Sequence, residues 1–251
     1  MRMSVQQVRS VAVLTGAGVS AESGVPTFRG PGGLWRRYRA EDLATPHAFR
    51  RDPRLVWEWY DWRRGLIGGC RPNAAHRALV EMEPCFDEFT LITQNVDGLH
   101  GLAGSRNVVE LHGNIWGLRC TAGCRSPWED RTVPLPEIPP HCASCGSLAR
   151  PDVVWFGESL PGDALDVAFS AVRRCQVMLV IGTSALVNPA ASLPLMALQS
   201  GAYVIEINPQ PTPLSDVVDE AIREPAADAL PGWWRAWQAE GNRGITGRDL
   251  G

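Results

Sequence analysis

The sequence predicts an α/β fold built on a doubly wound parallel sheet, with a smaller domain inserted into it. Apolar runs at 8–14, 88–92, 177–181 and 204–207 have the length and composition of buried parallel strands. Helical or irregular stretches separate these runs, which is the alternation expected of a doubly wound sheet. Two stretches break the pattern: residues 32–74 are rich in Trp, Arg and Tyr, and residues 116–151 hold four cysteines and six prolines.

The first apolar run leads into the segment GAGVSAESGVPTFRG at 16–30. Gly16, Gly18 and Ala21 fit the G-x-G-x-x-A pattern of a strand-to-helix turn, where small residues let the backbone approach a pyrophosphate. The sheet is therefore expected to be Rossmann-like and to bind a dinucleotide. A dehydrogenase would also need an acidic residue about 20 positions further on, after a second strand. Glu41 and Asp42 lie near that distance but follow no apolar run, which argues against a dehydrogenase.

Residues 53–64, in the first of the two stretches that break the pattern, look helical. We expect both stretches to be insertions that fold together beside the sheet. The cleft between the two parts would then lie at the carboxyl ends of the strands, the usual ligand position in such folds. We assign 1–31, 75–115 and 152–251 to the dinucleotide-binding domain, and 32–74 and 116–151 to the smaller domain.

Four cysteines in the second stretch have the spacing of a zinc ribbon. Cys120 and Cys124 form a C-x3-C pair, Cys142 and Cys145 form a C-x2-C pair, and 17 residues separate the pairs. Four thiolates suit a closed tetrahedral site for one structural zinc ion. His141 is a further candidate ligand, and two disulfides are the alternative, which a reducing cytoplasm disfavours. The smaller domain would thus combine a helical module with a zinc ribbon.

Composition excludes several classes of protein. The net charge is −3 and the pI is about 6.0, which gives no sign of nucleic-acid binding. All 24 basic residues are arginine, so a Walker-type or Schiff-base lysine is excluded. No apolar run approaches the roughly 18 residues of a membrane span, and no signal peptide is recognisable. We expect a cytoplasmic protein that contacts neither membrane nor nucleic acid.

Two polar motifs follow the glycine-rich segment, TQNVDGLH at 93–100 and LHGN at 111–114. With them the chain resembles the sirtuins, NAD-dependent protein-lysine deacylases, from about residue 8 to about residue 235. The resemblance implies NAD and one structural Zn²⁺ as cofactors and acylated-lysine proteins as substrates. We expect the chain to be a monomer.

The resemblance also assigns the catalytic residues. In the family, the carbonyl oxygen of an acyl-lysine attacks the ribose as nicotinamide leaves, and a base then deprotonates a ribose hydroxyl. His112 would be this base, because a histidine titrates near neutral pH. Asn95 would contact the reacting ribose and Gln94 would lie near its hydroxyls. Asp97 and the backbone of Val96 would bind the nicotinamide carboxamide, although Asn-x-Asp-Gly is also a good turn sequence.

Further cofactor contacts are implied along the chain. Phe28 would cover the ribose and Arg29 would help to hold the phosphates. The chain departs from residues common in the family at three positions on the adenosine side, which are Asn188, Gln210 and Glu224. The remaining implied contacts are Gly16, Ala17, Gly18, Ala21, Glu22, Thr27, Trp35, Gly182, Thr183, Ser184, Asn208, Pro209, Gln210 and Ala226.

Tyr60 and Arg63 form a Y-x-x-R step that resembles the subgroup removing succinyl, malonyl or glutaryl groups as well as acetyl. Three residues apart on a helix, they share one face, and a guanidinium binds a carboxylate in a bidentate fork. The alternative is a solvated arginine and an interfacial tyrosine on an amphipathic helix. By resemblance, the peptide groove is lined by Val154, Trp155, Phe156 and Gly157.

Two other functions use the same motifs. The chain could transfer ADP-ribose to proteins, or bind NAD and zinc as a non-catalytic sensor. The presence of Tyr60, Arg63 and His112 together favours deacylation over both.

Overall fold

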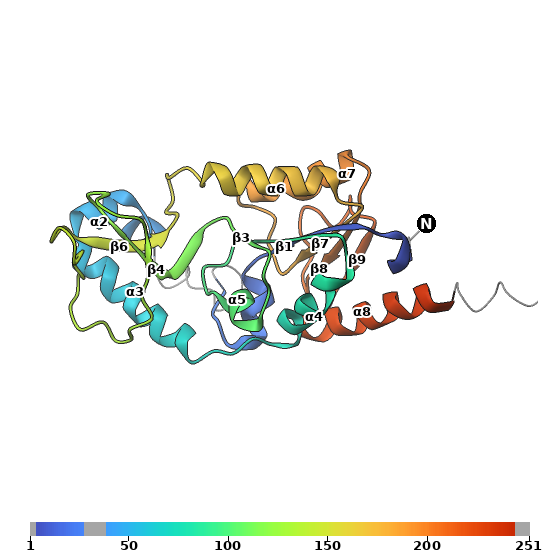
Figure 1. Cartoon of the computed structure of the whole chain (residues 1–251), viewed down its shortest axis with the longest axis horizontal. Helices are drawn as coiled ribbons and strands as arrows, with labels where there is room; N and C mark the ends of the chain where they lie inside the picture. The colour runs from blue at the N-terminus through green and yellow to red at the C-terminus, as the bar shows by residue number, and fades with distance from the viewer. Residues whose placement is uncertain (1–3, 28–38, 244–251) are drawn as a thin grey trace, which may run out of the picture.

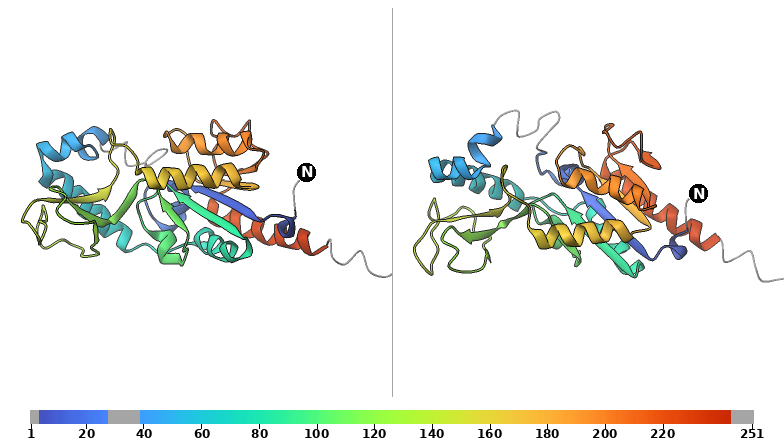
Figure 2. Two further views of the ribbon diagram at one scale, coloured as in Figure 1. Left: turned by 45° about the horizontal axis from the view of Figure 1, so that its top comes forward. Right: turned by 90° about the horizontal axis from the view of Figure 1, so that it is seen from above.

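The computed structural model describes residues 4–27 and 39–243, and contains two sheets (Figures 1 and 2). The larger sheet has six parallel strands in the order β3-β2-β1-β7-β8-β9. The strand order reverses between β1 and β7, so the sheet is doubly wound as predicted, with its switch point beside the glycine-rich segment. The strands are β1 (Ser10–Thr15), β2 (Glu88–Thr93), β3 (Val108–Glu110), β7 (Val177–Ile181), β8 (Tyr203–Ile207) and β9 (Glu220–Ile222).

Helices cover both faces of this sheet, as Figure 1 shows. On one face α4 (Ala74–Met82) and α8 (Ala226–Arg243) pack against Val177, Leu179 and Ile181 of β7. On the other face α6 (Gly162–Arg174) and α7 (Leu193–Gln199) pack against Met178 and Val180. All five residues of β7 are buried, because alternate side chains of a central parallel strand enter different cores.

The smaller sheet is antiparallel and has the order β5-β4-β6, with β4 spanning Gly113–Cys120, β5 Trp128–Glu129 and β6 Ala149–Val153. It packs on α3 (Pro53–Gly68) through a core of its own, in which Trp57 donates its indole N–H to the carbonyl oxygen of Ala149 at 2.8 Å. The helix predicted at 53–64 is thus confirmed and continues for one more turn. It begins where the Asp52 carboxylate accepts the N–H of Leu55 at 2.9 Å.

Short elements complete the chain. Neither the three strands of the smaller sheet nor β3 and β9 were predicted; β3 and β9 have three residues each and lie at the edges of the larger sheet. In the described parts of the chain, no helix has both the length and the apolar character needed to cross a membrane. The other elements are η1 (Val5–Gln7), η2 (Ala17–Ser23), α1 (Ala40–Leu43), α2 (Pro46–Arg51), η4 (Glu83–Cys85), α5 (Leu99–Ala103) and η5 (Ala190–Ser192).

Candidate active site

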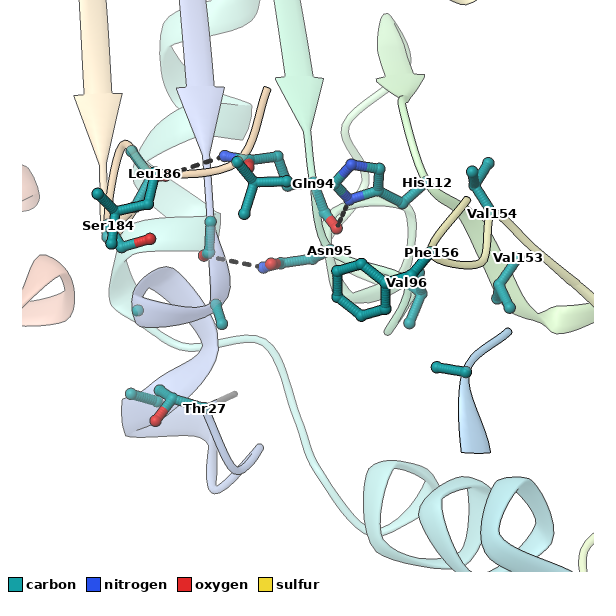
Figure 3. A pocket seen from close by; sticks show the side chains of 18 of the residues that line it. Thr27, Gln94, Asn95, Val96, His112, Val153, Val154, Phe156, Ser184 and Leu186 are labelled. Carbon is teal, nitrogen blue, oxygen red and sulfur yellow. Dashed lines mark hydrogen bonds between the residues drawn. The ribbon is translucent and has the colours of Figure 1, made fainter. Parts of the chain in front are cut away.

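A cavity of about 620 Å³ lies at the carboxyl ends of β1, β2, β7 and β8, a size typical of cofactor sites (Figure 3). Segments far apart in the sequence meet there, and they carry most of the predicted site residues. Those that line the cavity are Gly16, Ala17, Gly18, Ala21, Glu22, Thr27, Tyr60, Arg63, Gln94, Asn95, Val96, His112, Val154, Trp155, Phe156, Gly157, Gly182, Thr183, Ser184, Asn208, Pro209, Gln210 and Ala226.

The glycines of the first turn permit a close approach between two loops. A Cβ atom on Gly16 would lie 2.8 Å from the carbonyl oxygen of Gly182, and one on Gly18 would lie 2.7 Å from the Cα of Gly182. Instead, the N–H of Gly18 donates to the carbonyl oxygen of Gly182 at 2.8 Å. Any side chain at 16 or 18 would push apart the two loops that form the floor of the cavity.

His112 lies at the start of the HGN motif and is held by the main chain. Its Nδ1 lies 2.9 Å from the carbonyl oxygen of Gln94, which can only accept, so Nδ1 carries the proton. In the neutral ring Nε2 is therefore the proton acceptor. Burial lowers the pKa of His112 below its ordinary value of 6.5, although the bond to Gln94 opposes this shift. The ring is thus neutral at neutral pH, with Nε2 as the atom that can accept a proton.

Asn95 is buried and bound on two sides. Its side-chain amide donates to the carbonyl oxygen of Gly16 at 3.0 Å, and its backbone N–H donates to Oγ1 of Thr93 at 3.0 Å. Next to it, the amide of Gln94 donates to Oγ1 of Thr183 at 3.0 Å. These bonds join the ends of β1, β2 and β7, so both amides keep fixed positions at the cavity (Figure 3).

Asp97 does not line the main cavity, although its carboxylate lies near enough to Arg63 for that guanidinium to favour the charged form. Asp97 lines a second cavity of about 340 Å³, together with Gly98, Leu99 and Trp116. Its carboxylate accepts the N–H of Leu99 at 2.9 Å, and burial raises its pKa above the ordinary value. Val96, the neighbouring residue of the motif, lines the main cavity.

Tyr60 and Arg63 enter the cavity from α3, and both are buried. The phenol oxygen of Tyr60 accepts the indole N–H of Trp155 at 2.9 Å, and the guanidinium of Arg63 lies 4.9 Å from the ring centre of Trp59. Burial raises the pKa of Tyr60 and lowers the pKa of Arg63. Only 5% of Arg63 is exposed, so it is not the solvated arginine of the alternative interpretation.

The loop that carries the predicted peptide groove is fixed by an ion pair. Arg150 pairs with Glu158 at 2.6 Å, and Glu158 accepts the backbone N–H of Trp155 at 2.9 Å. The guanidinium of Arg150 also lies 3.4 Å from the ring centre of Trp155. Phe156, which is 46% exposed, is left to project at the mouth of the cavity (Figure 3).

The four cysteines converge on one point. The Sγ atoms of Cys120, Cys124, Cys142 and Cys145 all lie within 4.8 Å of one another, and no disulfide joins them. Cys124 Sγ is 3.5 Å from the Sγ atoms of Cys120 and Cys142. Four thiolates around zinc stand roughly 3.8 Å apart, so this donor set fits one tetrahedral Zn²⁺. His141 instead pairs with Glu137 at 3.1 Å.

Three predicted site residues cannot be placed, and some residues of the cavity were not predicted. Phe28, Arg29 and Trp35 lie outside the described residues. Several cavity residues were not predicted, because an apolar residue after a strand, a single Trp on a helix and a single Thr in a loop carry no distinctive signal of their own. They include Trp59, Leu160, Leu186, Val187 and Thr212.

The chain is similar to known proteins over most of its length. The model of the Sir2 family matches residues 16–189. The NAD-dependent protein deacylase of Aquifex aeolicus is 56% identical over 221 residues, which cover 88% of this chain and 92% of that protein. The NAD-dependent protein deacylase of Thermus thermophilus is 50% identical over 234 residues, 91% of each chain.

Solved structures show the same similarity. A Sir2 homologue in complex with NAD has a TM-score of 0.86 at 48% identity, over 94% of this chain and 92% of that chain. A Sir2 complex with a p53 peptide and NAD⁺ has a TM-score of 0.81 at 33% identity, over 95% of this chain and 96% of that chain.

Proposed function

Because the chain belongs to the Sir2 family, we propose that it is an NAD-dependent protein-lysine deacylase that releases nicotinamide and O-acyl-ADP-ribose. The observation that carries this proposal is the neutral, main-chain-held His112 beside Asn95 in a dinucleotide-sized cavity. Relatives with about half of their residues identical bear the name of that activity, and solved relatives hold NAD.

Bound NAD would supply an electrophilic ribose carbon once its bond to nicotinamide weakens. Nε2 of His112 would take the proton of a ribose hydroxyl, since Nδ1 is already committed to the Gln94 carbonyl oxygen. The fixed amides of Asn95 and Gln94 would orient the ribose, which keeps the hydroxyl within reach of this base. Gly16 and Gly18 leave room for the phosphates.

We propose that Tyr60 and Arg63 bind the terminal carboxylate of a succinyl or malonyl group. Both are buried side chains on one face of α3, and both reach the cavity that holds His112. The indole N–H of Trp155 occupies a lone pair of the Tyr60 oxygen, which leaves the phenol proton to donate elsewhere. A buried guanidinium and a phenol donor together suit an acidic acyl chain.

We propose that Cys120, Cys124, Cys142 and Cys145 hold one structural zinc ion that fixes the outer part of the small sheet. Four thiolates that hold a metal ion suit a reducing compartment, and we propose the cytoplasm as the location. We further propose that residues 32–74 and 116–151 form the smaller domain, and that the chain acts as a monomer on acylated-lysine proteins without contacting nucleic acid.

Mass spectrometry of one peptide in acetyl-lysine and succinyl-lysine forms, with and without NAD, tests the activity. We expect NAD-dependent loss of both acyl groups, with nicotinamide and O-acyl-ADP-ribose as products. Addition of ADP-ribose to a protein without deacylation would support a transferase instead. Binding of NAD without any turnover would support a sensor and overturn the proposal.

A further inference from the structure

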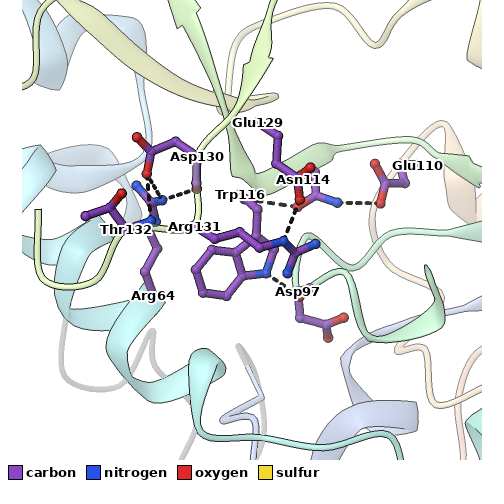
Figure 4. Close-up of polar contacts among 9 residues, drawn as sticks. All are labelled: Arg64, Asp97, Glu110, Asn114, Trp116, Glu129, Asp130, Arg131 and Thr132. Carbon is purple, nitrogen blue, oxygen red and sulfur yellow. Dashed lines mark hydrogen bonds and ion pairs between the residues drawn. The ribbon is translucent and has the colours of Figure 1, made fainter. Parts of the chain in front are cut away.

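Trp116 of β4 connects the small sheet to the loop that carries Asp97 (Figure 4). Its indole N–H donates to the carbonyl oxygen of Asp97 at 2.9 Å. The preceding residue, Ile115, donates its backbone N–H to the carbonyl oxygen of Val96 at 2.8 Å. Two consecutive residues of β4 thus hold two consecutive carbonyl groups of the loop.

The loop has little freedom to move away from this indole. Gly98 has φ +74°, and a Cβ atom there would lie 3.1 Å from Cδ1 of Trp116, so the ring packs directly on the glycine. The carboxylate of Asp97 accepts the N–H of Leu99. Trp116 thus holds the peptide group between Asp97 and Gly98 through the Asp97 carbonyl oxygen. The orientation of this peptide group in turn sets the direction of the Asp97 side chain.

Trp116 is itself held from several sides. Its backbone N–H donates to Oδ1 of Asn114 at 3.0 Å, and the amide of Asn114 donates to Glu110 at 2.7 Å. Its carbonyl oxygen accepts the N–H of Asp130 at 2.8 Å, and Asp130 pairs with the fully buried Arg64 at 2.7 Å. Figure 4 shows these contacts around the indole. The ring is only 6% exposed, so its orientation is set by its surroundings.

We infer that Trp116 is a positioning residue for nicotinamide, acting through Asp97. The inference rests on the proposed function and on the role that the resemblance implies for Asp97, which is binding of the nicotinamide carboxamide. A buried carboxylate binds an amide well only when its direction is fixed beforehand. The small sheet would therefore influence the affinity for nicotinamide through Trp116, which does not line the main cavity.

The test is Trp116→Phe, which keeps an aromatic ring and removes the indole N–H that donates to Asp97. We expect the inhibition constant of nicotinamide and KM for NAD to rise about 3- to 10-fold, the equivalent of one net hydrogen bond at about 1.4 kcal/mol per tenfold change. KM for the acyl-peptide should stay within about twofold, because Trp116 is not among the residues lining the main cavity.

Trp128→Phe is the matched control, since Trp128 lies on β5 of the same sheet and pairs with Leu118. This variant should leave the inhibition constant of nicotinamide unchanged. In an Asp97→Asn background, Trp116→Phe should have little further effect, whereas independent, multiplying effects would overturn the inference. If Trp116→Phe does not fold, Asn114→Ala, which frees the backbone N–H of Trp116, should shift the same constant in the same direction.

The wild-type enzyme in the same assay separates the two proposals. A wild type without NAD-dependent turnover contradicts the proposed function. If the wild type turns over normally and Trp116→Phe leaves the inhibition constant of nicotinamide unchanged, only the role of Trp116 is contradicted.

Discussion

Replacing Arg63 with Met should change which acyl group the enzyme prefers. Arg63 is 5% exposed, and burial lowers the pKa of its guanidinium, so the group lies in surroundings that hydrate it poorly. A carboxylate brought next to it would gain charge-assisted hydrogen bonds worth about 1.5–3 kcal/mol. At about 1.4 kcal/mol per tenfold change, their loss lowers kcat/KM for a succinyl-peptide roughly 10- to 100-fold. Methionine keeps the unbranched apolar stem, so most of the packing beneath Trp59 remains.

The assay compares kcat/KM for succinyl- and acetyl-lysine forms of one peptide. The acetyl substrate has no carboxylate to lose, so its kcat/KM should change by less than about threefold. Arg54→Met is the matched control: Arg54 lies on the same helix but is exposed and pairs with Glu58 at 2.9 Å. Equal losses on both substrates would show that Arg63 supports the fold of the pocket and does not bind the carboxylate.

Three further predictions concern the base and the metal. His112→Ala should lower turnover at least about 100-fold without lowering the melting temperature appreciably. His47→Ala, a change at an exposed position, should have no effect on turnover. Residual activity of the His112→Ala variant within tenfold of wild type would exclude His112 as the base. Because burial lowers the pKa of His112, and only the neutral ring can accept a proton, kcat/KM should fall on acidification with a midpoint below pH 6.5; a midpoint clearly above 6.5 would contradict the assigned environment. Removing zinc with a chelator should lower the melting temperature by about 10 °C or more and abolish turnover. Both should recover when Zn²⁺ is added back. An unchanged melting temperature of the metal-free protein would exclude a structural zinc site.

The central strands could be predicted from the sequence and the edge strands could not. The run at 177–181 is apolar throughout, because β7 is buried on both faces. Val108–Glu110 and Glu220–Ile222 are half-buried and only three residues long. They become strands because β2 and β8 offer them unpaired backbone groups, and this depends on the assembled sheet.

The site was predictable where a residue type carries its own chemistry. A cysteine pair or a histidine in a polar motif is visible in the sequence, and those residues do meet at one cavity or one cluster. The supporting contacts were not visible. Nothing in the sequence indicates that the indole of Trp116 reaches the carbonyl oxygen of Asp97, or that Arg150 pairs with Glu158, because both contacts exist only after distant segments pack.

The bond between Nδ1 of His112 and the carbonyl oxygen of Gln94 also affects how stable the protonated base is. A carboxylate partner would stabilise the imidazolium, whereas a neutral carbonyl oxygen gives it less support and burial opposes its charge. Burial therefore disfavours the protonated ring, and the proton must leave it before the next turnover. Since the acceptor is main chain, changing the side chain of residue 94 does not remove it. A substitution at position 94 would therefore change the contact to the ribose and leave the acceptor of the His112 N–H in place.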